Sequence, residues 1–223
     1  MSSTAENNQW KYMEEMCILV DENDHQVGAD TKKNCHLIDK KDGSLMRHRA
    51  FSVFLFNSES KLLLQKRSDE KITFPGYWAN TCCSHPLNVP GETETENDLG
   101  VKRAAIRKLK HELGIESDQL SVDDFTGVLT VHYNAASDDT WGENEIDHVL
   151  VIKKNVEFKV NPEEVAEARF FTKEEVEHLL DEGDAGREKV SPWFSRISRY
   201  YLNTLFEGSE DPKRIVKDGI VAL

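Results

Sequence analysis

The residues most able to do chemistry gather in the segment WANTCCSHPL at positions 78–87. Two of the four cysteines, Cys82 and Cys83, stand side by side there, and His85 follows two residues after Cys83. Thiols and an imidazole at this spacing could form half of a zinc site, a redox pair, or a reactive cysteine beside a metal-binding histidine. The sequence has no Cys-x-x-Cys pair, which weakens the structural zinc interpretation.

A second set of candidate ligands is spread along the chain. His36 and His48 fall in predicted loops or strand starts, and the sequence GENEID adds Glu143 and Glu145. Residues two apart on a strand point to the same face, so both carboxylates can reach one site. Together with His85, these side chains suit a divalent transition ion or zinc. The competing interpretation is that several of the eight histidines are ordinary surface or core residues.

The segment 99–113, LGVKRAAIRKLKHEL, is strongly basic. Lys108 and Glu112 are four residues apart, so on a helix they share a face. Taken alone, the pattern favours a solvated helix face with a salt bridge. The functional alternative is a cation cluster for phosphates in which Glu112 holds Mg²⁺, because magnesium prefers one or two carboxylates plus ligand phosphates. Arg67 and Lys71, just before the sequence ITFPG, could extend that cluster.

Cys83 itself could be a nucleophile, a metal ligand or a proton donor, or simply a small buried hydrophobic residue. Phe74, Tyr77 and Trp78 lie close in sequence and indicate an apolar wall. Burial would raise the pKa of the thiol and keep it protonated. A neutral thiol in an apolar pocket is a poor nucleophile but can act as an acid.

The strands that would position these residues follow from hydrophobic patterning. Alternating apolar residues from position 51, a turn at NSES and a second apolar run at 62–64 predict a hairpin covered on both faces. A strand, a turn and a second short strand are predicted over 17–30, and further strands over 125–135 and 145–152.

Three helices are predicted from periodicity and capping signals. In 99–113, Val101, Ala105, Leu109 and Leu113 form one apolar ridge, and Gly114 is the expected stop. The sequence TKEE at 172–175 has the capping-box pattern, and SPW at 191–193 places Pro at the first helical position. A hairpin-rich sheet with a few packed helices predicts an α+β or α/β/α architecture, without a linker between two domains.

Composition and charge narrow the class of protein. The 223 residues are 38% hydrophobic, and no run approaches the ~18 apolar residues of a membrane span. The net charge of −13 disfavours DNA or RNA as a general partner but permits a small phosphorylated ligand. The acidic start predicts no secretory signal and an unordered extension over residues 1–16. Four cysteines without such a signal favour a reducing compartment.

Four separated motifs, TFPGYWANTCCSHPL, HRAFSVFLFN, RAAIRKLKHELGI and WGENEIDHVL, resemble type I isopentenyl-diphosphate isomerases of the eukaryotic kind, a branch of the Nudix fold. The resemblance runs from about Cys17 to about Phe206. It implies a Nudix-type α/β/α sandwich, with a mixed central sheet flanked by helices and extra N- and C-terminal elements. Residues 17–223 would then form a single catalytic domain. The resemblance further implies a monomer. A cytoplasmic location is the default, with a peroxisomal or plastid form left open.

The segment that corresponds to the Nudix box departs from the form found in hydrolases. A pyrophosphohydrolase would show Arg-Glu-hydrophobic-x-Glu-Glu-x-Gly, whereas the segment 107–114 reads RKLKHELG. Only the last glutamate, Glu112, survives, and a lysine and a histidine replace the other two. This leaves one carboxylate for one magnesium and adds a cation for a diphosphate, which argues against hydrolysis.

The resemblance implies a role for individual residues. The divalent-ion site, described as zinc, magnesium or manganese, would take His36, His48, His85, Glu143 and Glu145, and a substrate-bridged Mg²⁺ would take Glu112. The cations around the diphosphate would be Lys32, Arg67, Lys71 and Lys108. Cys83 matches the catalytic cysteine because it precedes Ser-His-Pro, and Tyr133 and Trp193 match residues that line the hydrocarbon pocket. Cys35 and His132 receive no role, and Cys82 is expected to fill space.

The implied reaction is the reversible conversion of isopentenyl diphosphate to dimethylallyl diphosphate through a tertiary carbocation. Glu145, helped by Tyr133, would deliver a proton on one face, and Cys83 would remove one on the other, with the acid and base roles open. Trp193 would attract the cation by ~2 kcal/mol or more, although ordinary helix packing explains this residue equally well. Two alternatives remain: a Nudix pyrophosphohydrolase of nucleoside diphosphate derivatives, and a non-catalytic metal-binding protein on the same fold.

Overall fold

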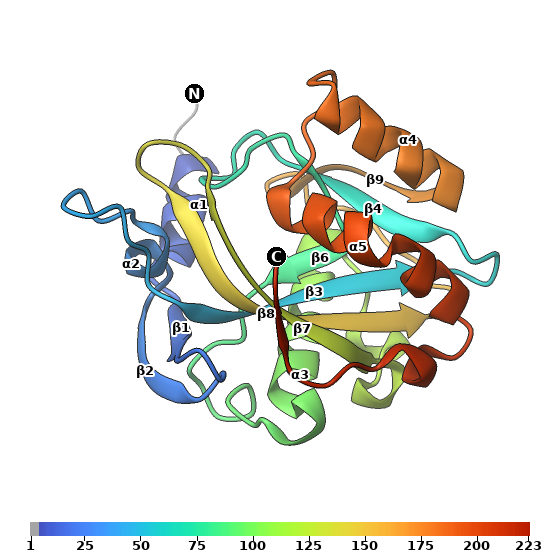
Figure 1. Ribbon diagram of the computed structural model, residues 1–223, viewed down its shortest axis with the longest axis horizontal. Coiled ribbons are helices and arrows are strands. Elements are labelled where there is room, and N and C mark those ends of the chain that lie inside the picture. The colour runs from blue at the N-terminus through green and yellow to red at the C-terminus, as the bar shows by residue number, and fades with distance from the viewer. Residues whose placement is uncertain (1–4) are drawn as a thin grey trace.

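The computed structural model describes residues 5–223, in which five α-helices and ten strands follow one another (Figure 1). The helices are α1 (Ala5–Tyr12), α2 (Lys32–His36), α3 (Leu99–Leu113), α4 (Lys173–Asp184) and α5 (Pro192–Gly208), with short 3₁₀ helices at Glu96–Asp98, Ser117–Gln119, Val122–Asp124 and Pro212–Ile215. The strands are β1 (Met16–Val20), β2 (Gln26–Thr31), β3 (His48–Phe56), β4 (Leu62–Arg67), β5 (Trp78–Ala79), β6 (Cys82–Ser84), β7 (Thr126–Ala136), β8 (Gly142–Lys153), β9 (Val165–Phe171) and β10 (Ile220–Ala222).

The strands form one mixed sheet with β3 near its centre. The main path runs β10-β7-β8-β3-β1-β2, and β4, β5, β6 and β9 branch from it. β3 and β8 pair in parallel from His48 opposite Glu145 to Phe56 opposite Lys153, while β7 and β8 form a long antiparallel hairpin. The parallel pairing brings the starts of β3 and β8, which carry predicted site residues, to the same end of the sheet.

The predicted hairpin over 48–67 is present only at its turn. β3 and β4 pair at one position, Phe56 opposite Leu62, and then separate. β4 pairs with β9 and β5 instead, and the edge of β3 is taken by β6. The prediction that both faces of these strands are covered is confirmed, because every residue of β3 is buried. The local hydrophobic pattern therefore predicts the two strands and their burial correctly. It does not predict which strands they pair with, because those strands are distant in sequence.

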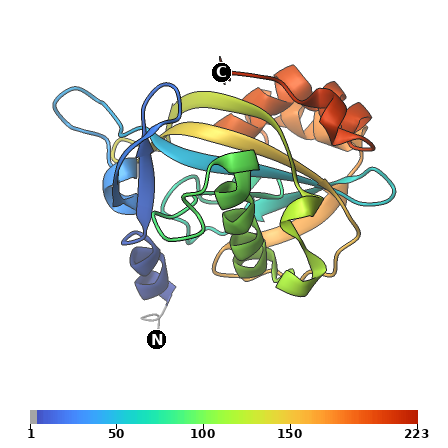
Figure 2. The same ribbon diagram turned by 90° about the horizontal axis from the view of Figure 1, so that it is seen from below.

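Helices cover both faces of the sheet, as predicted for an α/β/α sandwich. Figure 2 shows α3 on one side of the strands and α4 and α5 on the other. Along β3, Phe54 and Phe56 pack in the core layer of α5, whereas Val53 and Leu55 pack in the layer of α3. This alternation follows from the two-residue period of a strand. Among the described residues, no helix combines the length and apolar character needed to cross a membrane.

The predicted apolar ridge of α3 is buried, since Val101, Ala105, Leu109 and Leu113 are each less than 5% exposed. Gly114 ends this helix with φ +61°, a left-handed conformation that glycine adopts without strain. A Cβ at this position would lie 2.3 Å from a backbone oxygen of the neighbouring loop. The helix therefore ends at the predicted residue for two independent reasons.

The other two predicted helices also begin where their sequence signals indicate. At the start of α4, the Thr172 side chain accepts from the backbone N–H of Glu175, and the Glu175 side chain accepts from that of Thr172. In α5 Ser191 occupies the N-cap position and Pro192 follows at the first helical position. These starts are local features, which explains why the sequence alone located them.

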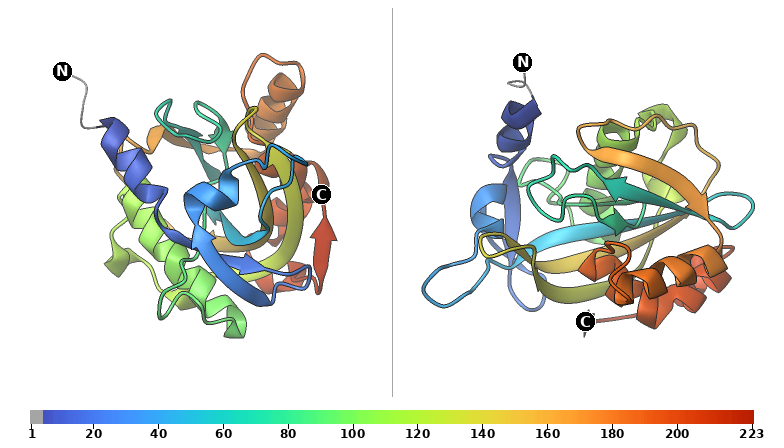
Figure 3. Two further views of the ribbon diagram at one scale, coloured as in Figure 1. Left: turned by 90° about the vertical axis from the view of Figure 1, so that its left-hand side faces the viewer. Right: turned by 90° about the horizontal axis from the view of Figure 1, so that it is seen from above.

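The N-terminal region differs from the unordered extension that was predicted. Residues 5–12 form α1, and β1 begins at Met16; residues 1–4 lie outside the described part of the chain. α1 is held by tertiary contacts: Asn8 donates to Glu163, Gln9 donates to Glu164, and Trp10 lies edge-on to Trp141. Figure 3 shows α1, α2 and the turn of the β7–β8 hairpin at the same end of the molecule. The composition of this segment gave no signal for contacts with residues some 150 positions away.

Candidate active site

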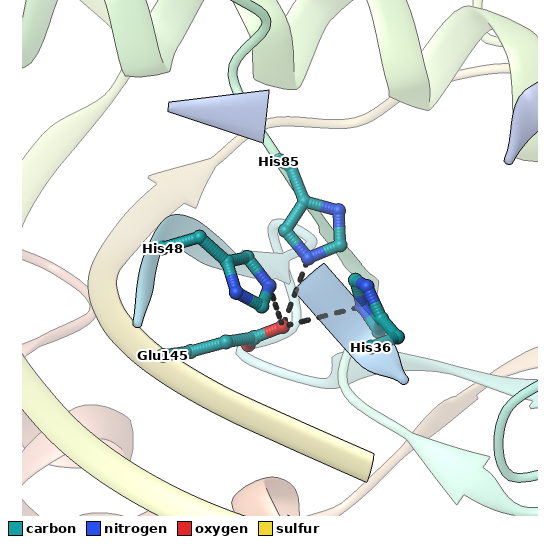
Figure 4. Close-up of side chains that lie close together, drawn as sticks. All are labelled: His36, His48, His85 and Glu145. Carbon is teal, nitrogen blue, oxygen red and sulfur yellow. Dashed lines mark hydrogen bonds and ion pairs between the residues drawn. The ribbon is translucent and has the colours of Figure 1, made fainter. Parts of the chain in front are cut away.

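Four side chains from four separate segments of the chain converge on one point (Figure 4). His36 ends α2, His48 begins β3, His85 follows β6, and Glu145 lies in β8. Each offers one ligand atom, these atoms all lie within 4.8 Å of one another, and all four residues are buried. Three imidazoles and a carboxylate are a ligand set that zinc and other divalent transition ions accept.

Strand pairing explains this convergence. In the parallel β3–β8 ladder His48 lies opposite Glu145. β6 pairs antiparallel with β3, so that its last residue lies near the start of β3 and His85 follows directly. His36 reaches the same point from the short helix α2, which the chain enters from β2. The predicted ligands are thus 109 residues apart at most in sequence, yet they meet at one end of the sheet.

The imidazoles of His36 and His48 direct lone pairs toward the point where the four side chains meet. Oε1 of Glu145 lies 2.8 Å from Nε2 of His85, 3.3 Å from Nε2 of His48 and 3.9 Å from Nε2 of His36. The Nδ1 atoms of His36 and His48 lie 2.7 and 2.9 Å from backbone carbonyl oxygens. Because a carbonyl only accepts, Nδ1 carries the hydrogen in each neutral ring and Nε2 keeps its lone pair. Both Nε2 atoms are buried without a hydrogen-bond partner, so these residues fit a bound cation.

Burial and the contacts between these side chains compete in setting their charges. At His48 burial acts to lower the pKa, but the contacts with Glu145 outweigh it and raise the pKa. Burial lowers the pKa of His85 to about 3, although the hydrogen bond to Glu145 acts in the opposite direction. Burial and the two neighbouring imidazoles hold the pKa of His36 well below its usual value. Burial also acts to raise the pKa of Glu145, but its contacts with His48 and His85 outweigh that effect and lower the pKa. Neutral imidazole and ionised carboxylate are the forms in which these side chains bind metal ions.

Glu143, the fifth predicted ligand, is not among the four residues whose ligand atoms converge. Its Oε2 lies 2.9 Å from the Tyr133 hydroxyl, which also contacts Oε2 of Glu145. A hydroxyl has one hydrogen and can donate to only one of these carboxyls at a time. Burial, and next the charge of Glu145, raises the pKa of Glu143 to about 8. Glu143 can therefore carry a proton and donate it to Tyr133 while Tyr133 donates to Glu145.

A cavity with about 350 Å³ of empty space, its mouth included, opens beside the His/Glu group. Eleven of the thirteen predicted site residues line it: Lys32, His36, Arg67, Lys71, Cys83, His85, Glu112, Tyr133, Glu143, Glu145 and Trp193. His48 and Lys108 are not part of this lining. Thr73 and Ser84 also face the cavity. Sequence reasoning missed them because small hydroxyl residues carry no distinctive signal outside a known motif.

Cys83 faces this cavity from β6 and packs against the core layer of α5. Burial raises the pKa of its thiol well above the usual value, although Arg67, with Nη1 4.0 Å from Sγ, acts to lower it. The thiol is therefore protonated at neutral pH. This agrees with the protonated state predicted from the apolar residues near it in sequence.

Arg67 holds the loop that forms one wall of the cavity. Its Nε donates to the carbonyl oxygen of Phe74 at 3.1 Å, and its Nη2 donates to that of Thr73 at 2.8 Å. Phe74 has φ +47°, a conformation that costs a non-glycine residue roughly 1–3 kcal/mol. The bonds from Arg67 stabilise this strained turn. Arg67 therefore shapes the cavity as well as lining it.

Aromatic residues form an apolar wall around Trp193. This tryptophan is 1% exposed, and its ring lies 6.2 Å from that of Tyr133 and 5.2 Å from that of Phe74. Its indole Nε1 donates to Oδ1 of Asn80 at 3.0 Å, and Asn80 in turn donates to backbone carbonyls of Val53 and Cys82. Asn80 fixes the orientation of the indole ring. No sequence pattern predicts this asparagine, which is a buried polar residue between two short strands.

Lys108 and Glu112 are buried, so the interpretation of this pair as a solvated salt bridge is wrong. They are 5% and 3% exposed, and Nζ of Lys108 lies 3.2 Å from Oε1 of Glu112. Burial acts to raise the pKa of Glu112, but Lys108 and Lys71 outweigh it and hold the pKa far below the usual value. Lys71 forms a second buried ion pair with Glu164. A carboxylate and two ammonium groups are thus held together at low exposure, where ligand phosphates would interact with them strongly.

α1 covers a second cavity next to the first. Lys32, Lys71 and Thr73 line both cavities, and Lys108 lines the second. In this second cavity the Tyr12 hydroxyl of α1 lies 3.0 Å from Nε2 of His111, whose Nδ1 lies 3.1 Å from Nζ of Lys108. The predicted cations therefore line two neighbouring cavities that share part of their walls, and Gln9 and Tyr12 of the N-terminal helix line the second of them.

Comparison with known proteins agrees with this fold. Residues 46–194 match the NUDIX domain. The chain is 50% identical over 201 residues to mouse isopentenyl-diphosphate Delta-isomerase 1, covering 90% of this chain and 88% of the mouse protein. The chain belongs to the isopentenyl-diphosphate Delta-isomerase family.

Further relatives support this assignment. The bovine isopentenyl-diphosphate Delta-isomerase 1 is 51% identical over 88% of this chain and 86% of its own length. The chloroplastic isopentenyl-diphosphate Delta-isomerase I of Arabidopsis thaliana is 52% identical over 85% of this chain and 66% of its own length. Among solved structures, a NUDIX hydrolase from Alicyclobacillus acidocaldarius has a TM-score of 0.54 at 10% identity, covering 77% of this chain and 97% of its own. That structure supports the fold alone.

Proposed function

We propose that this protein catalyses the reversible isomerisation of isopentenyl diphosphate to dimethylallyl diphosphate. The observation that carries the proposal is the pairing of two proton-carrying groups in one cavity. A protonated thiol, Cys83, and a carboxyl held by a phenol, Glu145 with Tyr133, both face the space beside the His/Glu group. An unactivated alkene is a very weak base, so moving its double bond needs one group that adds a proton and another that removes one.

The residues divide between these two tasks. Glu145, with the hydroxyl of Tyr133 in contact with its Oε2, adds a proton to the terminal carbon in one direction. In that direction Glu145 starts protonated and Cys83, as a thiolate, takes a proton from the allylic carbon, which leaves a thiol and a carboxylate. In the reverse direction the Cys83 thiol returns its proton to the allylic carbon and the Glu145 carboxylate takes one. General acid–base catalysis typically contributes ~10²–10⁴-fold. The barrier for protonating an alkene is larger than that, so the cavity must also stabilise the carbocation.

Trp193 and its neighbours supply that stabilisation. The face of a tryptophan attracts a cation by ~2 kcal/mol or more when water is excluded. The hydrogen bond from Nε1 to Asn80 holds the ring in place, and Phe74 and Tyr133 extend the apolar wall. An apolar wall also keeps water from capturing the cation as an alcohol. Trp193 also packs in the core layer of α5, and its place in the lining of the cavity supports a role beyond helix packing.

Two divalent ions fit the remaining polar residues. We propose that His36, His48, His85 and Glu145, with Glu143 adjoining through Tyr133, hold zinc, manganese or magnesium, and that Glu112 holds a substrate-bridged Mg²⁺. A bound ion would polarise the groups it touches and favour proton donation from them. Lys32, Arg67, Lys71 and Lys108 would bind the diphosphate, whose binding energy positions the hydrocarbon end. The buried Lys71 and Lys108 would exchange their present carboxylate partners, in part, for phosphate oxygens.

Hydrolysis of a diphosphate is disfavoured by the same residues. A hydrolase of this fold needs several carboxylates on α3, and this helix offers Lys108 and His111 at the corresponding positions. A non-catalytic metal-binding protein would not need a protonated thiol and a phenol–carboxyl pair facing one cavity. We further propose a monomer with residues 17–223 as its catalytic domain. For its location we propose the cytosol, with peroxisome or plastid as alternatives, since its four free cysteines suit a reducing compartment.

Proton NMR of isopentenyl diphosphate in D₂O with Mg²⁺ tests the proposal. The wild-type protein should convert the vinyl signals to those of dimethylallyl diphosphate and introduce deuterium. Cys83→Ala and Glu145→Gln should abolish this conversion while circular dichroism shows an intact fold. Turnover close to wild type in Cys83→Ala would refute the mechanism, and release of phosphate from nucleotide substrates would favour the hydrolase instead.

A further inference from the structure

Besides its ion pair with Lys108, the carboxylate of Glu112 accepts hydrogen bonds from two further side chains. Gln65 Nε2 donates to its Oε2 at 3.0 Å, and Cys82 Sγ lies 3.6 Å from the same oxygen. Lys108 Nζ lies 3.2 Å from the other oxygen, Oε1. Gln65 comes from β4 and Cys82 from β6, so the central sheet reaches across to a residue of α3.

The distribution of these donors between the two oxygens is uneven. A carboxylate oxygen accepts about two hydrogen bonds. Oε2 therefore has both of its lone pairs engaged by Gln65 and Cys82, whereas Oε1 has one engaged by Lys108 and one left. Glu112 is 3% exposed, so no ordinary solvent shell competes for the remaining position.

Gln65 is itself fixed, which makes it a rigid support rather than a mobile contact. It is 1% exposed, and its Nε2 also donates to the backbone oxygen of Thr81 at 3.0 Å. The Thr81 hydroxyl donates to Leu63 O at 2.6 Å and accepts from Leu55 N at 2.9 Å. The amide is thus held by a network that joins β3, β4 and the connection between β5 and β6. Cys82 lies in the ladder with β3, opposite Val53.

We propose that Gln65 and Cys82 are positioning residues that occupy Oε2 of Glu112 and leave Oε1 as the one oxygen available to a divalent ion. The inference rests on the proposed function, in which Glu112 holds a substrate-bridged Mg²⁺. It also replaces the interpretation of Cys82 as a residue that merely fills space. Residues that orient a metal ligand typically affect metal affinity by 10–100-fold when they are replaced.

The test measures metal binding directly. The protein is first loaded with one equivalent of Zn²⁺ to fill the His/Glu site. Mn²⁺ is then titrated in the presence of methylenediphosphonate, a stable diphosphate mimic, and free Mn²⁺ is measured by electron paramagnetic resonance. Glu112→Gln defines the signal that depends on this carboxylate.

Four variants then separate the contributions of the two residues. Gln65→Met removes the amide at nearly constant volume and should weaken Mn²⁺ binding by roughly 10–100-fold. Cys82→Ala should weaken it by about two- to fivefold, because a thiol is a weak donor, and Cys82→Ser should restore it. Ser198→Ala, which removes a buried polar atom on α5, should bind Mn²⁺ as the wild type does. Thermal unfolding of each variant verifies that the fold is retained.

The results distinguish this inference from the proposed function. Unchanged Mn²⁺ binding in folded Gln65→Met would overturn the inference, even if the wild type isomerises isopentenyl diphosphate. Absence of diphosphate-dependent Mn²⁺ binding in the wild type would overturn it as well. Weaker binding in Gln65→Met in a protein that does not isomerise would support the positioning role and refute the activity. As a second readout, Gln65→Met should raise the Mg²⁺ concentration for half-maximal activity, while activity at saturating Mg²⁺ changes less.

Discussion

A largely buried histidine outside the cavity, His148, should make the stability of this protein depend on alkaline pH. His148 of β8 lies between two carboxylates, with Nε2 2.9 Å from Oδ2 of Asp24 and Nδ1 3.0 Å from Oδ1 of Asp98. Arg49 of the neighbouring strand β3 donates to Asp24 at 2.8 Å, and Lys102 of α3 acts on Asp98. Together these contacts join the β1–β2 turn, the start of α3 and two central strands.

The magnitude follows from the pKa of this histidine. Burial acts to lower the pKa of His148, but the hydrogen bonds and charges of Asp24 and Asp98 outweigh it and raise the pKa from 6.5 to about 9. Because the folded-state pKa is raised, the stabilisation is fully present below pH 6.5 and is lost as pH rises through about 9. A shift of this size corresponds to about 3 kcal/mol of unfolding free energy.

The comparison of wild type with His148→Gln isolates this contribution from other groups that titrate at high pH. Urea unfolding of both proteins between pH 6 and pH 10 should show the wild type losing about 3 kcal/mol more than the variant. Histidine NMR should place the pKa of His148 near 9. A constant difference between the two unfolding free energies across this range, or an NMR pKa near 6.5, would refute the reasoning.

Two further variants test the geometry of the cavity. Tyr133→Phe removes the hydroxyl that contacts both Glu143 and Glu145, so kcat should fall by at least about 10²-fold. The affinity of the His/Glu group for Zn²⁺ should stay close to wild type. An unchanged kcat would exclude the hydroxyl from proton transfer. Asn80→Ala leaves the indole N–H of Trp193 buried without an acceptor and should lower the unfolding free energy by about 1–3 kcal/mol and reduce kcat. Unaltered stability and turnover in this variant would show that the orientation of Trp193 does not matter.

Sequence alone determined the features that depend on local periodicity or on short motifs. The ridge of α3, the capping box at Thr172 and the stop at Gly114 each follow from residues within a few positions of one another. The set of candidate site residues also came from sequence, because the resemblance assigned roles to separated motifs before any contact was known. The protonated state of Cys83 was predicted correctly from its aromatic neighbours, since burial alone is sufficient to raise the pKa of a thiol.

Only the tertiary structure decided how these parts meet. β3 pairs with β8 and β6 rather than along the length of β4, because strand pairing is a competition among segments distant in sequence. That competition places His48 opposite Glu145, encloses Lys108 with Glu112, and brings Gln65 and Cys82 to one oxygen of the same carboxylate. The contacts that order α1 and the hydrogen bond from Trp193 to Asn80 are of the same kind. Each of these contacts joins polar groups that interact strongly because they are buried. Burial depends on the folded chain as a whole, so no local sequence pattern predicts it.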